Sequence, residues 1–251
     1  MVIDTQPRHK DRWSPTGRTE RTQSYYLVRE CPEQSMDYWT PRQDPDGVLR
    51  TRCTDEERDW YLEGVAEEIN YAKRLDAYSV VDFGAGPGWF LDELNCRQKV
   101  AVETSGRARG QLHAKGIEVV SVLESLASSE FQLVIANHVI EHLRDPIDAI
   151  QQIHRILIPG GDLIIGTPDF GSPCAQRFGA NYRMLHDETH CSLFTLESMH
   201  RFLRDHGFRI LDVRFPFPDR YATAENFARW HDTSKVSPPW PGNWMTFYCQ
   251  R

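Results

Sequence analysis

The chain has 251 residues, of which 40% are hydrophobic and 26% are charged, as is ordinary for a globular protein. Its formal net charge of −7 argues against general attraction to nucleic acid or to an anionic membrane, because both polyanions select basic surfaces. The start of the chain has no apolar core of signal-peptide length, and no window approaches the length of a membrane span. We therefore expect a cytoplasmic protein without nucleic-acid or membrane partners.

The cysteines are scattered and form no C-x-x-C pair: Cys31, Cys53, Cys96, Cys174, Cys191 and Cys249. A structural zinc site would need paired thiolates at short spacing. A secreted disulfide scaffold would be shorter and denser in cysteine. Free thiols in a reducing compartment are the expectation.

Residues 1–53 are predicted to lie outside the main domain. Residues 1–24 are polar without periodicity, which is typical of a flexible segment. The part that follows places aromatic residues among prolines and is expected to be an irregular lid. Tyr25 and Tyr26 are our candidates for contact with a substrate ring, although aromatics here could equally cover the edges of a sheet.

From residue 54 to residue 251 the sequence predicts one α/β domain. Thr54 followed by three acids indicates the start of a helix. Apolar runs then alternate with helical segments, which predicts a mostly parallel, doubly wound, Rossmann-like sheet covered on both faces. The predicted strands cover residues 78–84, 99–105, 117–122, 131–137, 159–168, 208–215 and 244–250. No helix is predicted between the last two strands, so we expect the seventh strand to be antiparallel, with residues 216–243 as a lid-like insertion.

The loop after the first of these strands contains three glycines, Gly84, Gly86 and Gly88, in the segment VVDFGAGPGWFL. Dinucleotide sites use G-x-G-x-x-G, whose third glycine is replaced here by Trp89, which argues against a nicotinamide dehydrogenase. The Gly-Lys-Ser/Thr of a P-loop is also missing.

Two carboxylates stand at the ends of neighbouring predicted strands. Glu103 ends the second strand, where a carboxylate can accept hydrogen bonds from a ribose diol. The alternative is that Glu103 is a solvated turn residue. Asp82 ends the first strand and is expected to orient the amides of the glycine loop or to bind a cofactor amino group through water.

Four segments together resemble the motifs of class I S-adenosylmethionine-dependent methyltransferases: VVDFGAGPGWFLDEL, AVETS, FQLVIANHVIEHLRDP and LIPGGDLIIGTPD. The combination of E-H-x-x-D-P with a later H-x-x-x-F-T is similar to the ubiquinone-biosynthesis-like group, which includes sugar and natural-product methyltransferases. The resemblance covers about residues 76–214 and the last strand. It implies S-adenosylmethionine as the cofactor and leaves the acceptor undefined.

The resemblance also implies a set of residues in contact with this cofactor: Gly84, Ala85, Gly86, Gly88, Glu103, Thr104, Val122, Leu123, Asn137 and His138. The glycine loop would line the methionine and ribose portion, and Glu103 would bind the ribose hydroxyls. Thr104, Val122 and Leu123 would flank the adenine. Many relatives have an acidic residue at the Val122–Leu123 position, so adenine recognition is expected to rest on backbone atoms.

The string HVIEH, residues 138–142, fits the H-x-x-E-H signature of zinc peptidases. That signature requires all five residues within one helix, whereas here they follow an apolar strand. We therefore predict a strand-to-helix loop in which His138 faces the cofactor while Glu141 and His142 brace the turn. Two imidazoles and a carboxylate could bind zinc or iron, but relatives carry Glu141 and His142 without a metal, and we expect none.

His138 and His190 are the candidate general bases, and His190 is also a candidate substrate contact. The alternative is that His138 only packs against the cofactor and that His190 is structural. The favoured function is methyl transfer to an oxygen or nitrogen of a small molecule, such as a sugar or a secondary metabolite. A protein or RNA methyltransferase and a non-catalytic cofactor-binding subunit are the alternatives. The oligomeric state stays open, a homodimer included.

Overall fold

The computed structural model describes residues 25–29, 42–43, 49–50 and 53–251, and its centre is a seven-stranded mixed sheet. In spatial order the strands are β10 (Arg209–Arg214), β11 (Trp244–Gln250), β8 (Leu157–Pro168), β7 (Phe131–Asn137), β4 (Ser79–Phe83), β5 (Gln98–Val102) and β6 (Glu118–Val120). The strands from β8 to β6 run parallel, and β11 is antiparallel to both β8 and β10. The predicted α/β class and the antiparallel last strand are confirmed.

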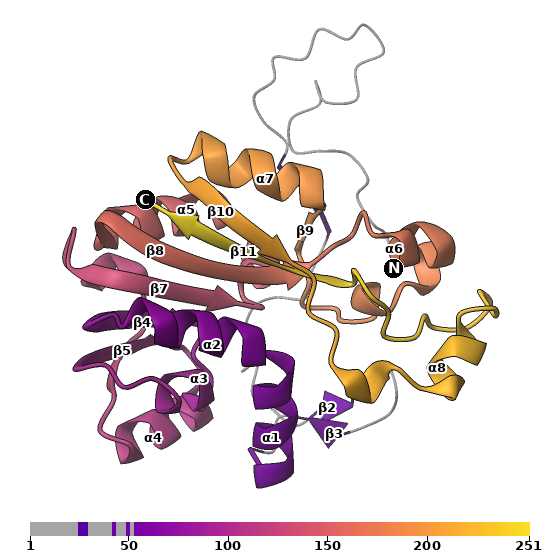
Figure 1. Ribbon diagram of the computed structural model, residues 1–251, viewed down its shortest axis with the longest axis horizontal. Helices are drawn as coiled ribbons and strands as arrows, with labels where there is room; N and C mark the ends of the chain where they lie inside the picture. The colour runs from indigo at the N-terminus through magenta and orange to yellow at the C-terminus, as the bar shows by residue number, and fades with distance from the viewer. Residues whose placement is uncertain (1–24, 30–41, 44–48, 51–52) are drawn as a thin grey trace, which may run out of the picture.

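Helices cover both faces of this sheet (Figure 1). The α-helices of the described residues are α1 (Asp55–Gly64), α2 (Ala66–Leu75), α3 (Trp89–Asp92), α4 (Gly106–Ala114), α5 (Pro146–Ile156), α6 (Pro173–Phe178), α7 (Leu196–Asp205) and α8 (Ala224–Arg229). Apolar side chains of α5 and α7 pack on one face, and those of α2, α3 and α4 pack on the other. Strand residues such as Val80 and Val81 are therefore buried in both directions, which explains the continuous apolar runs of the sequence.

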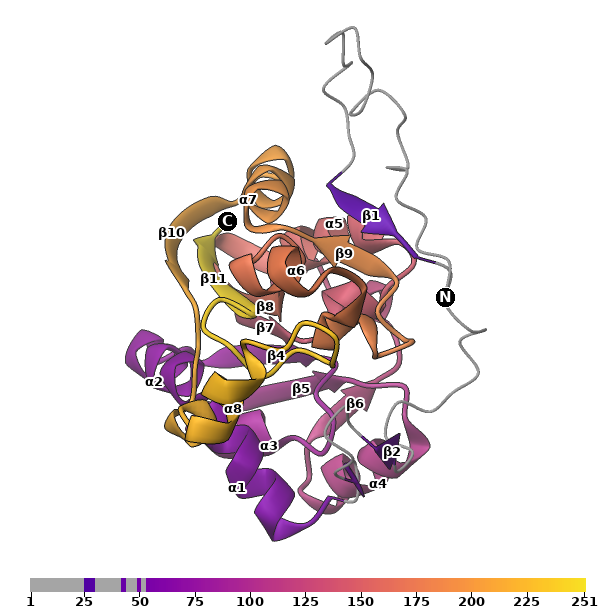
Figure 2. The same cartoon turned by 90° about the vertical axis from the view of Figure 1, so that its right-hand side faces the viewer.

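The carboxyl ends of the five parallel strands meet at one edge of the sheet, which Figure 2 faces. β4 lies between β5 and β7, so the chain order reverses next to β4. Open α/β sheets bind their ligands at such a switch point, outside the carboxyl ends of the strands. The glycine loop after β4 lies there, and α6 and α8 lie beyond the same edge (Figure 1).

Two local predictions differ from the structure. The segment GWFLDELNC, residues 88–96, is one of the helical segments that the sequence predicts between strands, but α3 ends at Asp92, because Glu93 N–H and Leu94 N–H donate to carbonyls three residues earlier and the chain then turns into β5. The expected irregular lid contains a strand, β1 (Tyr26–Val28), which pairs with β9 (Ser192–Phe194). Its partner is remote in sequence, so periodicity could not reveal the pairing. The short pair β2 (Arg42–Gln43) and β3 (Leu49–Arg50) was also not predicted, and the expected flexible segment 1–24 lies outside the described residues.

The cysteines are not all free. Cys53, Cys96, Cys174 and Cys249 are free thiols, whereas Cys191, next to β9, is disulfide-bonded. The expectation of free thiols throughout is therefore wrong at Cys191. Spacing along the chain could not show this, because a disulfide depends on the approach of two Cα atoms in space.

Across the described parts of the chain, no helix combines the length and the apolar composition needed to cross a bilayer.

Phe202 of α7 provides a test of the core. Its ring is fully buried and contacts the rings of Tyr25, Phe194 and His206 at centroid distances of 5.3, 5.2 and 4.8 Å. Phe202→Ala should lower the free energy of unfolding by about 3–5 kcal/mol, because it removes buried surface and leaves a cavity. Phe227→Ala is the control, since Phe227 is 61% exposed, and should change stability by no more than about 0.5 kcal/mol in urea unfolding. Equal losses in the two variants would contradict this packing.

Candidate active site

The glycine loop follows β4 in a backbone conformation that glycine adopts without strain. Gly84, Gly86 and Gly88 all have positive φ, at 75°, 53° and 79°. A Cβ at Gly84 would lie 2.9 Å from Cγ2 of Val139, and one at Gly88 would lie 2.6 Å from Cδ2 of Leu112. The missing side chains therefore let the loop approach both the segment after β7 and helix α4.

The carboxylate of Glu103 binds this loop directly. One oxygen accepts from the Gly86 N–H at 2.8 Å, and the other accepts from the N–H groups of Thr104 and Ser105, both at 2.8 Å. Glu103 is 7% exposed, so the alternative of a solvated turn residue is wrong. A carboxylate has about four acceptor sites, so these three bonds fix its plane and leave acceptor capacity for a ligand hydroxyl.

Asp82 is buried beside Glu103 at the end of β4 and is 4% exposed. Burial, and next the charge of Glu103, raise the pKa of Asp82 well above its ordinary value. The amide of Gly86 in the glycine loop bonds to Glu103, so Glu103 carries out the orienting role predicted for Asp82. A cationic ligand beside Asp82 would favour its ionised form, as the alternative prediction of an amino-group contact requires.

The predicted adenine contacts separate into two groups. Thr104 and Val122 are exposed near the ends of β5 and β6, Val122 by 50%. The Glu103 N–H donates to the Val120 carbonyl at 3.0 Å and joins these two strand ends. Leu123 is 3% exposed and packs in the core on the α5 and α7 face, so its side chain serves the core. Ala85, in the glycine loop, is also buried.

Buried polar atoms of two side chains near the end of β7 have unused hydrogen-bonding capacity. Within the described part of the chain, neither the amide nitrogen nor the amide oxygen of Asn137 has a hydrogen-bond partner. On α2, Glu68 is 2% exposed and accepts from the Thr246 hydroxyl through Oε1 at 2.7 Å, whereas its Oε2 has no such partner among those residues. Buried groups of this kind are rare unless a ligand satisfies them. Sequence analysis missed Glu68, which occupies an apolar position of its helix.

His138 follows β7 with a backbone conformation that is unusual for a side-chain-bearing residue. Its φ is 55°, and its N–H donates to the Gly166 carbonyl of β8 at 2.8 Å. The imidazole is 41% exposed, and its Nδ1 lies 3.4 Å from Oε1 of Glu141. Burial by itself would lower the pKa of His138, but the hydrogen bond and the charge of Glu141, with a contribution from Glu68, raise it above its ordinary value.

Glu141 lies among three imidazoles. It is fully buried, and its Oε2 accepts from the Thr167 hydroxyl of β8 at 3.0 Å. Burial would raise the pKa of Glu141, but His138, and then the charges of His142 and His190, lower it to about 2. Burial, and next the neighbouring His190, lower the pKa of His142 to about 4.

The peptidase interpretation of HVIEH is excluded by the backbone. Residues Ile140–His142 form a single 3₁₀ turn, and His138 and Val139 precede it in non-helical conformations. The predicted strand-to-helix loop is therefore present, and α5 begins after the N-cap Asp145 with Pro146 at its first position.

The other predicted substrate contacts lie in different surroundings. His190 is 6% exposed, its Nδ1 is 2.7 Å from the Met184 carbonyl, and its ring lies tilted against that of His142 at a centroid distance of 4.8 Å. Tyr25 donates its hydroxyl to Asp205 at 3.0 Å, and the ring of Tyr26 packs on Phe194 at 5.2 Å. Both tyrosines are buried in the core. Their contact with an acceptor stays a prediction that these core contacts do not support.

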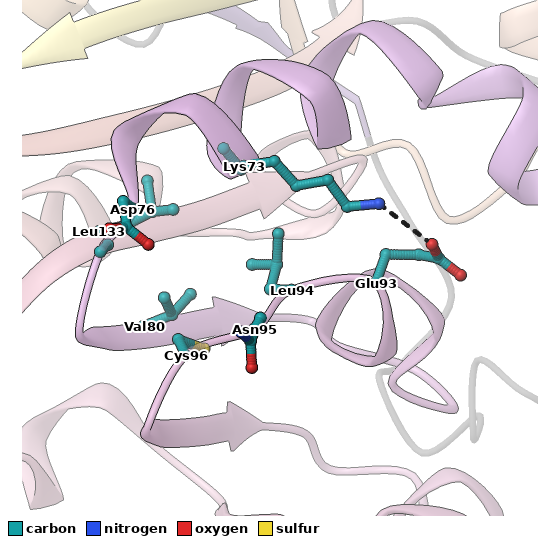
Figure 3. Close-up of a pocket in the computed structure, with 10 residues that line it drawn as sticks. Lys73, Asp76, Val80, Glu93, Leu94, Asn95, Cys96 and Leu133 are labelled. Carbon is teal, nitrogen blue, oxygen red and sulfur yellow. Dashed lines mark hydrogen bonds and ion pairs between the residues drawn. The ribbon is translucent and has the colours of Figure 1, made fainter.

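A separate cavity of about 250 Å³ opens at the opposite end of the sheet (Figure 3). It lies between the end of α2 and the starts of β4 and β7, with Val80, Leu133 and Cys96 in its wall. The ion pair of Lys73 and Glu93, at 3.3 Å, closes one side. None of the residues that line this cavity belongs to the loops described above.

Comparison with known proteins identifies the family. A family model described as a methyltransferase domain matches residues 45–213, well over half of the chain. This chain belongs to the class I S-adenosylmethionine-dependent methyltransferases. The resemblance to this class is confirmed. The glycine loop, Glu103 and the Asn137 amide, which has no hydrogen-bond partner among the described residues, are features that fit this cofactor.

Individual similar proteins are distant. A tRNA U34 carboxymethyltransferase of Dichelobacter nodosus is 28% identical over 117 residues, which are 40% of this chain and 38% of that protein. The chain thus spans less than two thirds of that curated relative. A Thermotoga maritima methyltransferase structure has 22% identity and a TM-score of 0.55, with 78% of this chain and 95% of that one covered. A complex of the Haloferax volcanii Trm112 activator with a methyltransferase has 13% identity and a TM-score of 0.59, with 78% and 92% covered. These two structures support the fold.

Glu103→Ala tests the predicted ribose contact. The variant should weaken S-adenosylmethionine binding by about 1–3 kcal/mol in calorimetry, because it removes a charged acceptor and releases the Gly86 amide. Glu118→Ala, at the exposed start of β6, is the control and should bind like the unaltered protein. Unchanged affinity in Glu103→Ala would overturn the ribose role.

Asp82→Asn tests the cost of the buried carboxyl group. The folded-state pKa of Asp82 is raised, so the folded protein holds a proton that the unfolded chain releases above about pH 4. The stability of the unaltered protein should therefore fall, relative to Asp82→Asn, as the pH rises from 4 towards 8 in urea unfolding. At pH 3 the carboxyl group is protonated in both states, and the difference should be smallest. If the difference in unfolding free energy between the two proteins became smaller as the pH rises, the raised pKa of Asp82 would be contradicted.

Proposed function

We propose that this methyltransferase moves the methyl group of S-adenosylmethionine to an oxygen or nitrogen of a small molecule, such as a sugar or a secondary metabolite. The observation that carries the proposal is the pair of His138 and Glu141 at the carboxyl edge of the sheet, 3.4 Å apart. When bound, the cofactor supplies a methyl group activated by its sulfonium. The protein then has to align the acceptor, exclude water and remove a proton.

His138 is suited to the proton transfer. Glu141 is buried and ionised, and its Oε1 lies 3.4 Å from Nδ1 of the imidazole. A carboxylate at this position favours a proton on Nδ1, which leaves Nε2 as the basic nitrogen. The ring is 41% exposed, so an acceptor hydroxyl can reach it. The hydrogen bond from the His138 N–H to Gly166 holds the residue in its positive-φ conformation beside the glycine loop.

Asn137 and Glu68 would bind polar groups at the same edge. Glu68 and the amide atoms of Asn137 are buried, and each residue has polar atoms without a hydrogen-bond partner in the described chain, so a ligand that satisfies them avoids the cost of orphaned groups. We place Asn137 at the methionine portion of the cofactor. Glu68, whose charge also acts on His138, would lie at the junction of cofactor and acceptor.

The segment 216–243 supplies an aromatic wall beyond this edge. Tyr221 stacks on Trp244 with ring centroids 5.7 Å apart, and Trp230 stacks on Trp240 at 4.1 Å. Arg220 lies 4.7 Å over the ring of Trp60 and ion-pairs with Glu63, which docks the segment on α1. Flat aromatic surfaces suit a ring or the apolar face of a sugar.

RNA is the second candidate acceptor, because one relative is named as a tRNA carboxymethyltransferase. The net charge of −7 favours the small molecule, since phosphate backbones select basic surfaces. Incubation with labelled S-adenosylmethionine and total tRNA, beside a panel of sugars and phenolic metabolites, separates the two. Label in tRNA alone would overturn the small-molecule proposal, and no cofactor binding at all would overturn both.

His138→Ala should lower kcat by about 10²–10⁴ with the acceptor that the panel identifies, because it removes the general base. Cofactor affinity should change little if the role is catalytic. His113→Ala, an exposed histidine on α4, is the matched control and should leave kcat unchanged. A loss below about fivefold in His138→Ala would return His138 to a packing role.

A further inference from the structure

Three potential metal ligands converge beside the predicted base. Ligand atoms of Glu141, His142 and His190 all lie within 4.8 Å of one another. Glu141 and His142 come from the 3₁₀ turn after β7, and His190 comes from the segment before β9. The Cys191 N–H donates to the Glu141 carbonyl at 2.7 Å and fixes the two segments against each other.

Each of the three side chains is also held by a polar contact outside the cluster. His190 Nδ1 lies 2.7 Å from the Met184 carbonyl, and His142 Nδ1 lies 3.2 Å from the Thr189 carbonyl. A carbonyl only accepts, so the contact of His190 places a proton on its Nδ1. The same tautomer of His142 fits its contacts with the Thr189 carbonyl and with the Thr189 hydroxyl at 2.9 Å, since that hydroxyl donates to Asp187. In this tautomer Nε2 is the nitrogen that can coordinate an ion. Glu141 accepts from the Thr167 hydroxyl through Oε2. Metal-ligating histidines are held in this way, with the second ring N–H on a backbone carbonyl.

We propose that Glu141, His142 and His190 bind one divalent transition-metal ion, with zinc as the best fit. Two imidazoles and one carboxylate match the protein ligands of many catalytic zinc sites, which keep a fourth position open. Magnesium and calcium prefer shells made of oxygen alone. This proposal replaces our sequence-based expectation that the chain binds no metal.

The ion would lie next to the proposed methyl-transfer site. Glu141 Oε1 is 3.4 Å from His138 Nδ1, so the carboxylate joins the metal ligands to the proposed base. An acceptor oxygen that reaches His138 would then lie close to the open position of the ion. Metal binding itself does not depend on the proposed function, because it needs only these three side chains.

The experiment is a metal titration of the full chain. The purified protein is dialysed against a chelator and titrated calorimetrically with zinc chloride, and Co²⁺ is then added as a spectroscopic probe of the ligand set. We expect one ion per chain and the intense visible absorption of Co²⁺ in a tetrahedral site. His190→Ala and Glu141→Gln should each weaken zinc binding by at least roughly 10- to 100-fold.

His186→Ala is the matched control, because this exposed histidine lies four residues before His190 and outside the ligand set. It should bind zinc like the unaltered chain. Circular dichroism and S-adenosylmethionine binding of every variant report whether it is folded. A folded chain that binds no zinc, or that binds it equally well after His190→Ala, overturns the metal site.

The same measurements separate this proposal from the proposed function. Cofactor binding and methylation without zinc binding would overturn the metal site alone. Zinc binding by a chain that methylates no acceptor would leave the metal site standing and overturn the function.

Discussion

The buried carboxylate of Glu141 is the interaction on which the arrangement of the candidate site depends. It accepts from Thr167 of β8, faces His138 after β7, and its ligand atom lies within 4.8 Å of those of His142 and His190. A buried ionised carboxylate is costly unless its charge is compensated. His138, whose pKa is raised, and the Thr167 hydroxyl provide that compensation, and their contacts with the carboxylate hold the loop in which the proposed base lies.

A second carboxylate, Glu103, holds the glycine loop in place where the cofactor is expected to bind. Its three backbone donors tie the glycine loop after β4 to the end of β5, so the loop is shaped before a ligand arrives. Preorganisation of this kind reduces the ordering cost of binding. Asp82 lies next to it with a raised pKa, and Glu68 and Asn137 have polar atoms without hydrogen-bond partners among the residues that the structure describes. These buried polar groups destabilise the folded protein at the edge where the cofactor and acceptor are expected to bind, as is usual for functional sites.

Membership of the family defines the cofactor but not the acceptor. We look for the acceptor site in the parts of the chain that carry no cofactor motif. Those parts are the segment 216–243 with its stacked aromatics and the loop that carries His190. We propose that these parts, which lie outside the glycine loop and the ends of β4 and β5, select the acceptor. The proposed metal site belongs to the same part of the molecule, where β7, β8 and the approach to β9 meet.

The sequence alone determined the sheet, the antiparallel last strand and the family, because apolar periodicity and the spacing of the glycine loop are local properties of the chain. It also placed Glu103 and His138 at strand ends, since parallel strands end at one edge. Only the tertiary structure decided which side chains meet. Glu68 occupies an apolar position of its helix, Tyr25 packs on Phe202, and His190 joins Glu141 from about fifty residues away. Contacts between remote segments depend on how the helices and loops pack, and no local pattern in the sequence encodes them.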